Sequence, residues 1–407
     1  MALIVQKFGG TSVANLERIR NVARRVIATK LEGNQVVVIL SAMAGETDRL
    51  INMAMEATDG KPDGREYDSL VSTGEQVTVT LMAMMLTSMG HQATSLLGFQ
   101  VKIHTDNTHK SARILDIDSE AISSELNKGH IVVIAGFQGI TKNNDVTTLG
   151  RGGSDTSAVA VAAALKADAC DIYTDVDGVY TTDPNIYDKA RKLKKISYDE
   201  MLELASAGAK VLQHRSVELA KIYGVPVYVK SSFNYEDGTL VTKEDSDMEK
   251  EVVSGVTYDK NQAKVTIVRV PDKPGVASRL FSPLSDRSIV VDMIIQNASI
   301  EGYTDLTFTV GKKDVKEVRS VLDLVAREIG AERIVYDEKI SKISVVGVGM
   351  KSHAGVATKM FESLAKENIN IQMISTSEIK ISCVIEDKYT ELAVRVLHDA
   401  FGLDQER

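Results

Sequence analysis

The chain begins with ALIVQKFGGTS, residues 2–12, in which a short apolar run leads into a cation, an aromatic residue, two glycines and two hydroxyls. The apolar run predicts a buried strand. A helix is expected directly after it, because apolar residues recur at spacings of three and four at Leu16, Ile19, Val22, Ala23, Val26 and Ile27. The glycines allow a tight turn, and the first helical N–H groups are unpaired. With the charge of Lys7 beside them, the stretch predicts a phosphate site, although a Gly-Gly pair alone is more often a plain turn.

Further apolar runs in the first 240 residues predict more strands of the same kind. They are QVVVIL (35–40), ATSLLG (93–98), HIVVIAGF (130–137), CDIYTDV (170–176) and VPVYVK (225–230). These runs are rich in Val and Ile and do not alternate with polar residues, which is typical of strands buried on both faces. Helical patterns lie between them. The sequence therefore predicts an α/β fold with a mostly parallel sheet between helices.

Composition limits the classes of function. The chain has 407 residues, 43% of them hydrophobic and 26% charged, which predicts two or three globular domains. A net charge of −8 makes nucleic acid and anionic membranes poor partners. The only cysteines, Cys170 and Cys383, lie far apart in apolar runs, as expected in a reducing cytosol. The first apolar run is too short for a signal peptide, and no run approaches the ~20 apolar residues of a membrane span. We therefore expect a cytoplasmic location.

An internal repeat fills the C-terminal part of the chain, after a polar stretch at 234–251 that we interpret as a linker. Residues 275–294 align without gaps to residues 355–374, and eight of the twenty positions are identical. Each copy reads β-α-β-β-α, but only the first has a fourth strand, ERIVY (332–336). Because a ferredoxin-like unit needs four strands, we expect EVVSGVTY (251–258) to complete the second copy, with the first copy inserted into it.

These patterns predict four parts of the chain. The expected ranges are a catalytic domain at 1–240, a linker and completing strand at 241–258, a first ferredoxin-like domain at 259–338 and a second at 339–407.

Polar motifs follow several predicted strands, where open α/β sheets bind ligands. SAMAGETDR (41–49) brings hydroxyls and an arginine, and LVSTGEQ (70–76) places Glu75 at a helix start, where it could also simply complement the helix dipole. TLGRGGSDTSA (148–158) is a second glycine-rich loop that runs into a helix. YTDVDGVYTTDP (173–184) suits a ribose and a base, although Asp-Gly alone is typical of a turn. Two glycine loops, each with a cation, indicate that two anionic ligands meet.

In this order, KFGGTSV, SAM-x-GETD, STGE, GRGGSDT, YTDVDGVYTTDP and GAKVL (208–212) resemble the aspartokinases of the amino-acid kinase fold. The C-terminal repeats resemble that family's two ACT domains. The resemblance implies phosphorylation of the β-carboxylate of L-aspartate by MgATP to 4-phospho-L-aspartate, the first step toward lysine, threonine and methionine. A carboxylate with a pKa near ~4 is ionised at pH 7, so the attack needs no general base. This agrees with a chain that pairs no Ser or Cys with a His in any motif.

The resemblance also implies residue roles in catalysis and substrate binding. Lys7 is similar to the family's γ-phosphate lysine, Asp155 to the carboxylate that orients it, and Arg151 to the residue that grips the substrate α-carboxylate. Glu75 is expected to bind the α-amino group. The rest of the aspartate pocket is expected to be Ser41, Thr47, Gly153 and Ser154.

For ATP, the resemblance implies contacts from Phe8, Gly9, Gly10, Thr174, Asp175, Tyr180, Asp183 and Lys210, in addition to Lys7. One departure is Asn185, where the family often has an arginine. Mg²⁺ is expected to be held mainly by phosphates and water, without a protein metal site.

The ACT pair is expected to sense an end product, lysine, threonine or both, although a dimerisation module is the plainer interpretation. The implied effector residues are Asp272, Gly275, Ala277, Val291, Asp292 and Gln296 in the first repeat, and Asn370 and Ile371 in the second. SHAG (352–355) replaces DKPG (272–275) in the second copy, so the copies are not equivalent. We expect a homodimer through the ACT domains, and Met248 could start a separate regulatory subunit.

Two alternatives stay open at this point. One is a kinase of the same fold that acts on glutamate-type substrates, and the other is a catalytically silent amino-acid sensor. Lys7, Arg151 and Asp155 argue against the sensor because a silent protein has no reason to keep all three. A dehydrogenase is disfavoured because no G-x-G-x-x-G follows the first strand.

Overall fold

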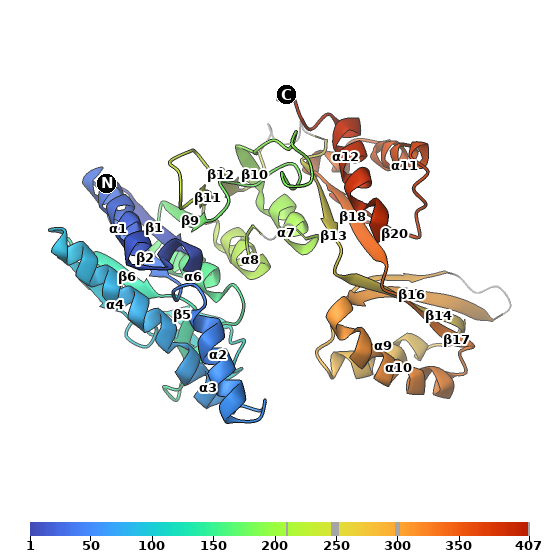
Figure 1. Ribbon diagram of the computed structural model, residues 1–407, viewed down its shortest axis with the longest axis horizontal. Coiled ribbons are helices and arrows are strands. Elements are labelled where there is room, and N and C mark those ends of the chain that lie inside the picture. The colour runs from blue at the N-terminus through green and yellow to red at the C-terminus, as the bar shows by residue number, and fades with distance from the viewer. Residues whose placement is uncertain (209–210, 246–251, 298–301, 406–407) are drawn as a thin grey trace. The chain divides into compact units, whose positions relative to one another are not determined.

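The computed structural model describes residues 1–208, 211–245, 252–297 and 302–405, so Lys210 and Met248 lie outside the described residues. The chain forms two compact units (Figure 1). The first comprises Met1–Val179, Lys192–Ala205 and Lys210–Met248, and the second comprises Tyr180–Arg191, Ser206–Ala209 and Glu249–Arg407. Among the described residues, no helix has both the length and the apolar character needed to cross a membrane.

An eight-stranded sheet forms the centre of the first unit (Figure 1). The strands lie in the order β10 (Lys195–Ser197), β12 (Thr239–Thr242), β11 (Val227–Ser231), β9 (Ala169–Thr174), β1 (Leu3–Phe8), β2 (Gln35–Leu40), β6 (Ile131–Ala135) and β3 (Ala93–Leu96). All neighbours pair in parallel except β11 with β12. The central strands are buried along nearly their whole length, because helices cover both faces.

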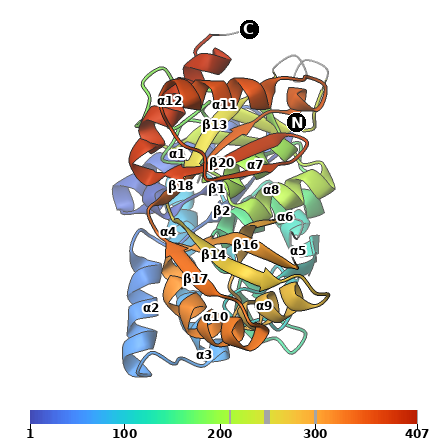
Figure 2. The same ribbon diagram turned by 90° about the vertical axis from the view of Figure 1, so that its right-hand side faces the viewer.

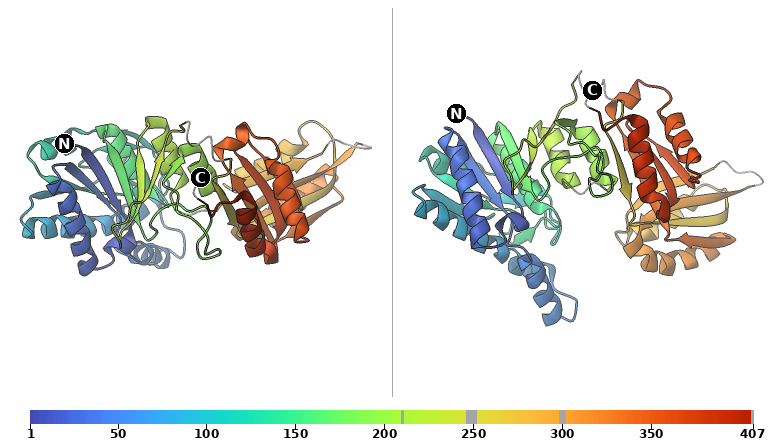
Figure 3. Two further views of the ribbon diagram at one scale, coloured as in Figure 1. Left: turned by 90° about the horizontal axis from the view of Figure 1, so that it is seen from above. Right: turned by 45° about the horizontal axis from the view of Figure 1, so that its top comes forward.

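Helices on the two faces supply the core. On one face, α1 (Leu16–Leu31) and α4 (Thr73–Ser88) pack their apolar residues into one cluster with residues of β1, β2 and β6. α6 (Gly153–Leu165) and α8 (His214–Tyr223) lie on the other side of the sheet (Figure 3). The periodicity predicted α1 correctly, since Ile19, Val22 and Val26 are all buried. The remaining helices are η1 (Gly10–Val13), α2 (Glu46–Ala57), α3 (Gly64–Val71), α5 (Glu120–Asn127) and α7 (Tyr198–Ser206).

A second, small sheet in this unit was not predicted. It has the order β5 (Ile114–Ile117), β4 (Ile103–Thr105), β7 (Gln138–Ile140) and β8 (Val146–Thr148). Each strand has only three or four residues, too few for periodicity to reveal. The fully buried carboxylate of Asp68 ties α3 to this region, because it accepts hydrogen bonds from His109 Nδ1 (2.7 Å) and Thr148 Oγ1 (2.6 Å).

The linker expected at 234–251 is wrong in its first half. Thr239–Thr242 forms β12, which pairs with both β10 and β11, and Thr239 and Val241 are buried. Four residues between acidic stretches give little signal, and the strand owes its structure to pairing in the sheet.

Two four-stranded antiparallel sheets form most of the second unit (Figure 2). One has the order β15 (Val291–Gln296), β16 (Tyr303–Gly311), β14 (Gln262–Pro271) and β17 (Arg333–Asp337), and it packs against α9 (Val276–Ser285) and α10 (Val315–Ile329). The other has the order β13 (Gly255–Asp259), β18 (Ile340–Val346), β20 (Lys380–Glu386) and β19 (Met373–Thr376), and it packs against α11 (Val356–Lys366) and α12 (Thr390–Phe401). Short 3₁₀ turns are η3 (Lys312–Asp314), η4 (Val348–Lys351) and η5 (Asp387–Tyr389).

The strand that precedes the first repeat belongs to the second sheet. β13 pairs antiparallel with β18, and Asp259 lies opposite Lys342. The first repeat therefore leaves and re-enters the second sheet between two neighbouring strands. The edge strands β15 and β19 meet in a shared cluster of Met293, Ile340, Met373 and Val384.

Candidate active site and effector region

The site lies where the parallel strands of the first unit end. Lys7 is near the end of β1, Ser41 follows β2, Gly136 follows β6 and Thr174 ends β9. Because parallel strands have their carboxyl ends at one edge, their polar residues gather there.

Lys7 and Asp155 form a nearly buried ion pair at this edge. Lys7 Nζ lies 2.6 Å from Asp155 Oδ1, and the two residues are only 9% and 8% exposed. Asp155 is in the first turn of α6, whose N-cap, Gly152, has a left-handed φ of 72° and no capping side chain. The pair thus holds an ammonium group beside the N-terminal end of a helix, a combination that favours an anion.

The first glycine loop packs closely against the chain after β2. A Cβ on Gly10 would lie 2.9 Å from the carbonyl oxygen of Ala42, so only glycine fits there. Phe8 is fully buried and stacks on Tyr173 with ring centroids 4.5 Å apart. The Phe8 side chain is therefore part of the core, and only its backbone is left to contact a nucleotide.

Hydroxyls from the loop after β2 and from the first turn of α6 converge beside the ion pair. Ser41 Oγ donates to Ser154 Oγ at 3.0 Å, and Ser154 is 8% exposed. Gly136 makes this approach possible, because a Cβ there would lie 2.9 Å from Ser154 Oγ. Thr47 is half-buried in the first turn of α2, and Gly153 is the first residue of α6.

Glu75 is a buried carboxyl group with one oxygen to spare. It is 2% exposed, Oε1 accepts from the Ala42 N–H at 3.0 Å, and Oε2 has no hydrogen-bond partner among the described residues. Burial raises the pKa of Glu75 to about 8. Without a cationic partner this group keeps its proton near neutral pH, and an ammonium group of a substrate at Oε2 favours the ionised form.

Arg151 lies on the second glycine loop with an exposed side chain and forms no ion pair with any described residue. The base of this loop is held by Arg215, which donates to the carbonyl oxygens of Leu149 (2.7 Å) and Ala112 (2.9 Å). Burial lowers the pKa of Arg215. Arg215 therefore anchors the start of the loop, while the side chain of Arg151 is exposed.

The predicted nucleotide contacts are split between the units. Thr174 and Asp175 end β9 in the first unit, and Thr174 Oγ1 donates to Asp175 Oδ1 at 3.0 Å. Tyr180 and Asp183 belong to the second unit. There Asp183 Oδ1 accepts from the Asn185 N–H at 2.9 Å.

The other Asp183 oxygen, Oδ2, accepts from Tyr258 OH at 3.0 Å. The Asp183 carboxylate is thus engaged within its own unit. Asn185, the departure from the family pattern, helps to hold it.

Five of the predicted effector residues lie on or just before edge strands of the two sheets in the second unit, and the other three lie around the start of α9. Val291, Asp292 and Gln296 lie on β15, whereas Asn370 and Ile371 precede β19, the edge strand that shares a cluster with β15. Asp292 forms an ion pair with Lys342. Asp272 and Gly275 precede α9, Gly275 has a left-handed φ of 88°, and Ala277 is in the first turn.

Sequence reasoning missed several residues of the active-site edge. Ser12 and Ser232 have hydroxyls 2.5 Å apart, and the Ser232 hydroxyl and N–H both donate to the Thr174 carbonyl oxygen. Ser232 follows the predicted strand 225–230, so the rule used for the other strands could have found it. Gly136 lay inside the predicted run 130–137, whose strand β6 ends at Ala135, so the predicted strand end was two residues too late to reveal it. Arg215 carried no signal, because its role depends on a contact distant in sequence.

Comparison with known proteins identifies the family that each part of the chain matches. Residues 2–231 match the amino acid kinase family, and residues 264–323 and 343–401 each match the ACT domain. A curated relative, aspartate kinase from Pseudomonas putida, is 57% identical over 405 residues, which cover 99% of this chain and 98% of the relative.

Two solved structures of E. coli aspartokinase III are also similar, one in complex with aspartate and ADP and one with lysine and aspartate. Each has a TM-score of 0.78 and 25% identity, and covers 98% of this chain and 99% of its own.

Proposed function

The chain belongs to the aspartokinases of the amino-acid kinase family, and on that premise we propose how its residues carry out the reaction. The enzyme transfers the γ-phosphoryl group of ATP to the β-carboxylate of L-aspartate, and its ACT domains make it subject to feedback by end products of the pathway. The observation that carries the proposed site is the nearly buried Lys7–Asp155 pair between the two glycine loops.

Catalysis rests on position and charge. The ammonium group of Lys7 neutralises charge on the transferred phosphoryl group, while Asp155 fixes the direction of Nζ. Asp155 is not a base, because the attacking carboxylate carries no proton to remove at neutral pH. Holding the two anions in line is the main task of the site.

Aspartate is held by its two other charged groups. Arg151 binds the α-carboxylate in a bidentate fork, and its exposed guanidinium group has no competing carboxylate among the described residues. Glu75 accepts the α-ammonium group on its free Oε2. The rest of the pocket is formed by Ser41, Thr47, Gly153 and Ser154.

ATP binds with its phosphates along the first glycine loop. The N–H groups of Gly9 and Gly10 face the phosphates, and Thr174 and Asp175 contact the nucleoside. Tyr180, Asp183 and Lys210 stay nucleotide contacts on the strength of the sequence resemblance. Mg²⁺ is held mainly by the ATP phosphates and water.

Regulation and assembly complete the proposal. Lysine, threonine or both bind near Asp272, Gly275 and Ala277 and the edge strands of the ACT pair. They inhibit the enzyme only to the extent that they bind its inactive conformation more tightly than its active one. The chain forms a homodimer through its ACT domains, in the cytoplasm, where the buried thiols of Cys170 and Cys383 stay reduced. The domain ranges 1–240, 241–258, 259–338 and 339–407 remain our proposed division of the chain.

The test is ADP release with MgATP and L-aspartate, measured alone and with lysine, threonine or both. For Lys7→Ala we expect kcat to fall by about 10²–10³, since a charge aimed at the transition state is lost. For Arg151→Ala we expect the KM for aspartate to rise. Wild-type kcat in the Lys7→Ala variant would contradict the role assigned to Lys7. If the wild-type enzyme phosphorylated glutamate as fast as aspartate, a kinase of glutamate-type substrates would be favoured.

A further inference from the structure

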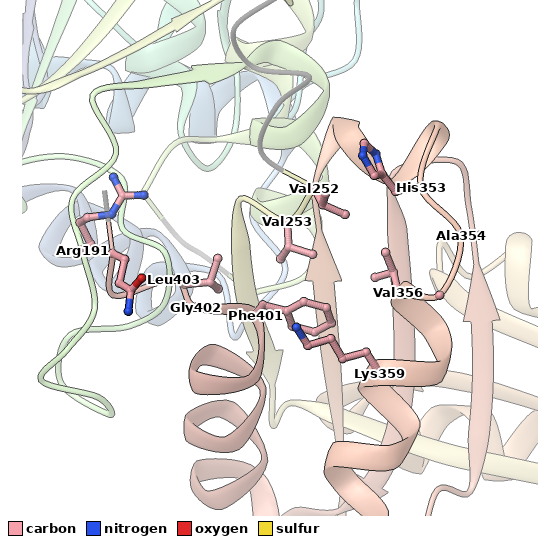
Figure 4. A pocket seen from close by; sticks show the side chains of 12 residues that line it. Arg191, Val252, Val253, His353, Ala354, Val356, Lys359, Phe401, Gly402 and Leu403 are labelled. Atoms are coloured by element: carbon pink, nitrogen blue, oxygen red, sulfur yellow. The ribbon is translucent and has the colours of Figure 1, made fainter. Parts of the chain in front are cut away.

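A cavity of about 260 Å³ lies in the second ACT domain, apart from the predicted effector residues (Figure 4). It opens between the start of α11, the end of α12 and the residues before β13. Its apolar wall includes Val253, Val356, Phe401 and Leu403, all at most 9% exposed. The apolar wall belongs to the folded core, whereas His353, Ala354, Gly355, Lys359 and Gln405 are exposed, so the cavity is open to solvent on that side.

The charged side chains that line this cavity, Lys359 and Arg191, are both cations, and His353 and Gln405 are its other polar side chains. Lys359 and His353 lie at one side and Arg191 at the other, as Figure 4 shows. No Asp or Glu is among the described residues that line it. Lys359 Nζ sits over the ring of Phe401, 5.3 Å from its centroid, and pairs with no carboxylate in the described part of the chain.

The first repeat provides an internal comparison. The repeat equates Lys359 with Arg279, eighty positions earlier. Arg279 lies 3.7 Å from Glu328 of α10, whereas Lys359 faces an aromatic ring of α12. The second copy has therefore kept the cation and replaced the carboxylate partner by an apolar surface. A cation between an apolar wall and solvent suits an external anion.

We propose that this cavity binds a small organic anion, a carboxylate with an apolar body. The carboxylate lies against Lys359, and the body rests on Val253, Val356 and Phe401. Binding needs both the carboxylate and the apolar body. An anion without an apolar body leaves the apolar wall exposed to water, and a neutral analogue gives Lys359 no anionic partner.

Binding at this cavity connects to the segment 180–191. The Arg191 N–H donates to Thr181 Oγ1 at 2.9 Å, and the Thr181 N–H donates to the Arg191 carbonyl oxygen at 2.9 Å. Thr181 in turn contacts the buried His398 Nε2 at 2.9 Å. The segment carries the predicted nucleotide contacts Tyr180 and Asp183, so occupancy should alter the KM for MgATP. This second step rests on the proposed function, whereas the binding step does not.

The experiment titrates the full chain by ligand-observed NMR with three probes. Phenylacetate has both parts, phenylacetamide lacks the charge and acetate lacks the apolar body. We expect phenylacetate to bind at least about tenfold tighter than either, since one charge-assisted contact is at stake. Lys359→Gln should weaken phenylacetate binding by a similar factor, while Lys366→Gln, which removes a cation from the last turn of the same helix, should not.

Equal binding of phenylacetate and phenylacetamide, no binding of phenylacetate, or unchanged binding to Lys359→Gln would overturn the proposed site. ADP release with and without phenylacetate then tests the link to the nucleotide segment. A changed KM for MgATP that Lys359→Gln abolishes supports the link. Binding without any change in KM overturns the link alone, and because NMR needs no turnover, an inactive enzyme would not hide the binding result.

Discussion

The carboxyl group of Glu75 is buried from water, and its burial makes the stability of the protein depend on pH. Burial raises its pKa from 4.5 to about 8, so between these values the folded protein holds a proton that the unfolded chain releases. The contribution of Glu75 to the free energy of unfolding is therefore fully present below about pH 4.5. It is lost as the pH rises through 8.

This sign gives a prediction for the protein without substrate. Relative to Glu75→Gln, the wild-type free energy of unfolding should fall between pH 5 and pH 8 by an amount on the order of a few kcal/mol. Urea unfolding at pH 5, 6.5 and 8 measures it. Comparison with the variant removes other titrating groups, and parallel stability curves for the two proteins would show that Glu75 does not carry the raised pKa.

The two adjacent glycines should differ in their tolerance of a side chain. A Cβ on Gly10 would meet the backbone oxygen of Ala42 at 2.9 Å, whereas a Cβ on Gly9 would meet only the end of the Lys7 side chain, at 3.4 Å. We expect Gly10→Ala to lose about 1–3 kcal/mol of stability by overpacking and Gly9→Ala to lose much less. Thermal unfolding of both variants decides it, and equal losses would mean that the loop can move aside.

Element by element, the sequence was informative where strands are long and buried. The runs that became β1, β2, β6, β9 and β11 were found because burial on both faces leaves a continuous apolar signal. Most strands of three or four residues were missed, because pairing with neighbours, not their own composition, makes β7, β8 and β12 strands. The four-residue strand β3 was found, from the apolar run at 93–98.

For the candidate site too, residues in local sequence motifs were predicted and residues that depend on distant contacts were not. Glycine loops adjoining helix starts identified Lys7, Ser154 and Asp155, which the structure brings together. Arg215 could not be found, because it supports the second glycine loop from a helix more than sixty residues later in the chain.

The pairing of β13 with β18 makes the first repeat removable. Asp259 and Lys342 are directly opposite, so an Asn-Gly turn in place of residues 260–341 should join the strands as a hairpin. We expect the shortened chain to fold and keep ADP release, but to lose any response to lysine or threonine, since the residues around Asp272 and Asp292 are gone. Circular dichroism and activity assays measure this.

The matched control removes Asp259 as well. This shifts the register of β13 by one residue and turns its core face, including the buried Val256, outward. The control should therefore unfold at lower urea concentration. If both shortened chains were equally stable, β13 would not be needed to complete the second sheet.

At the scale of the whole molecule, the chain after β9 passes from the first unit into the second, which contains the ACT domains, and then returns to the first. The segment 180–191 lies within the range of the amino acid kinase family match, yet it packs with α12 and β13. α12 holds it at three points: His398 contacts Thr181, Arg395 Nε donates to the Ile186 carbonyl oxygen at 3.1 Å, and Tyr187 OH donates to Asp399 Oδ1 at 2.5 Å. A regulatory helix thus sets the position of a segment with predicted nucleotide contacts.

Tyr187→Phe tests this connection with a minimal change. The variant loses the hydrogen bond to Asp399 but keeps the ring that packs edge-on against His398, 5.0 Å away. A hydrogen bond to a charged acceptor stabilises by about 1.5–3 kcal/mol, and part of that loss should appear as a KM for MgATP raised roughly three- to tenfold, with kcat at saturating ATP nearly unchanged. Tyr223→Phe, at a tyrosine that is 64% exposed, is the control. A KM for MgATP equal to that of the control would mean that α12 holds the segment without influencing the nucleotide, and feedback would then have to reach the active site by another route.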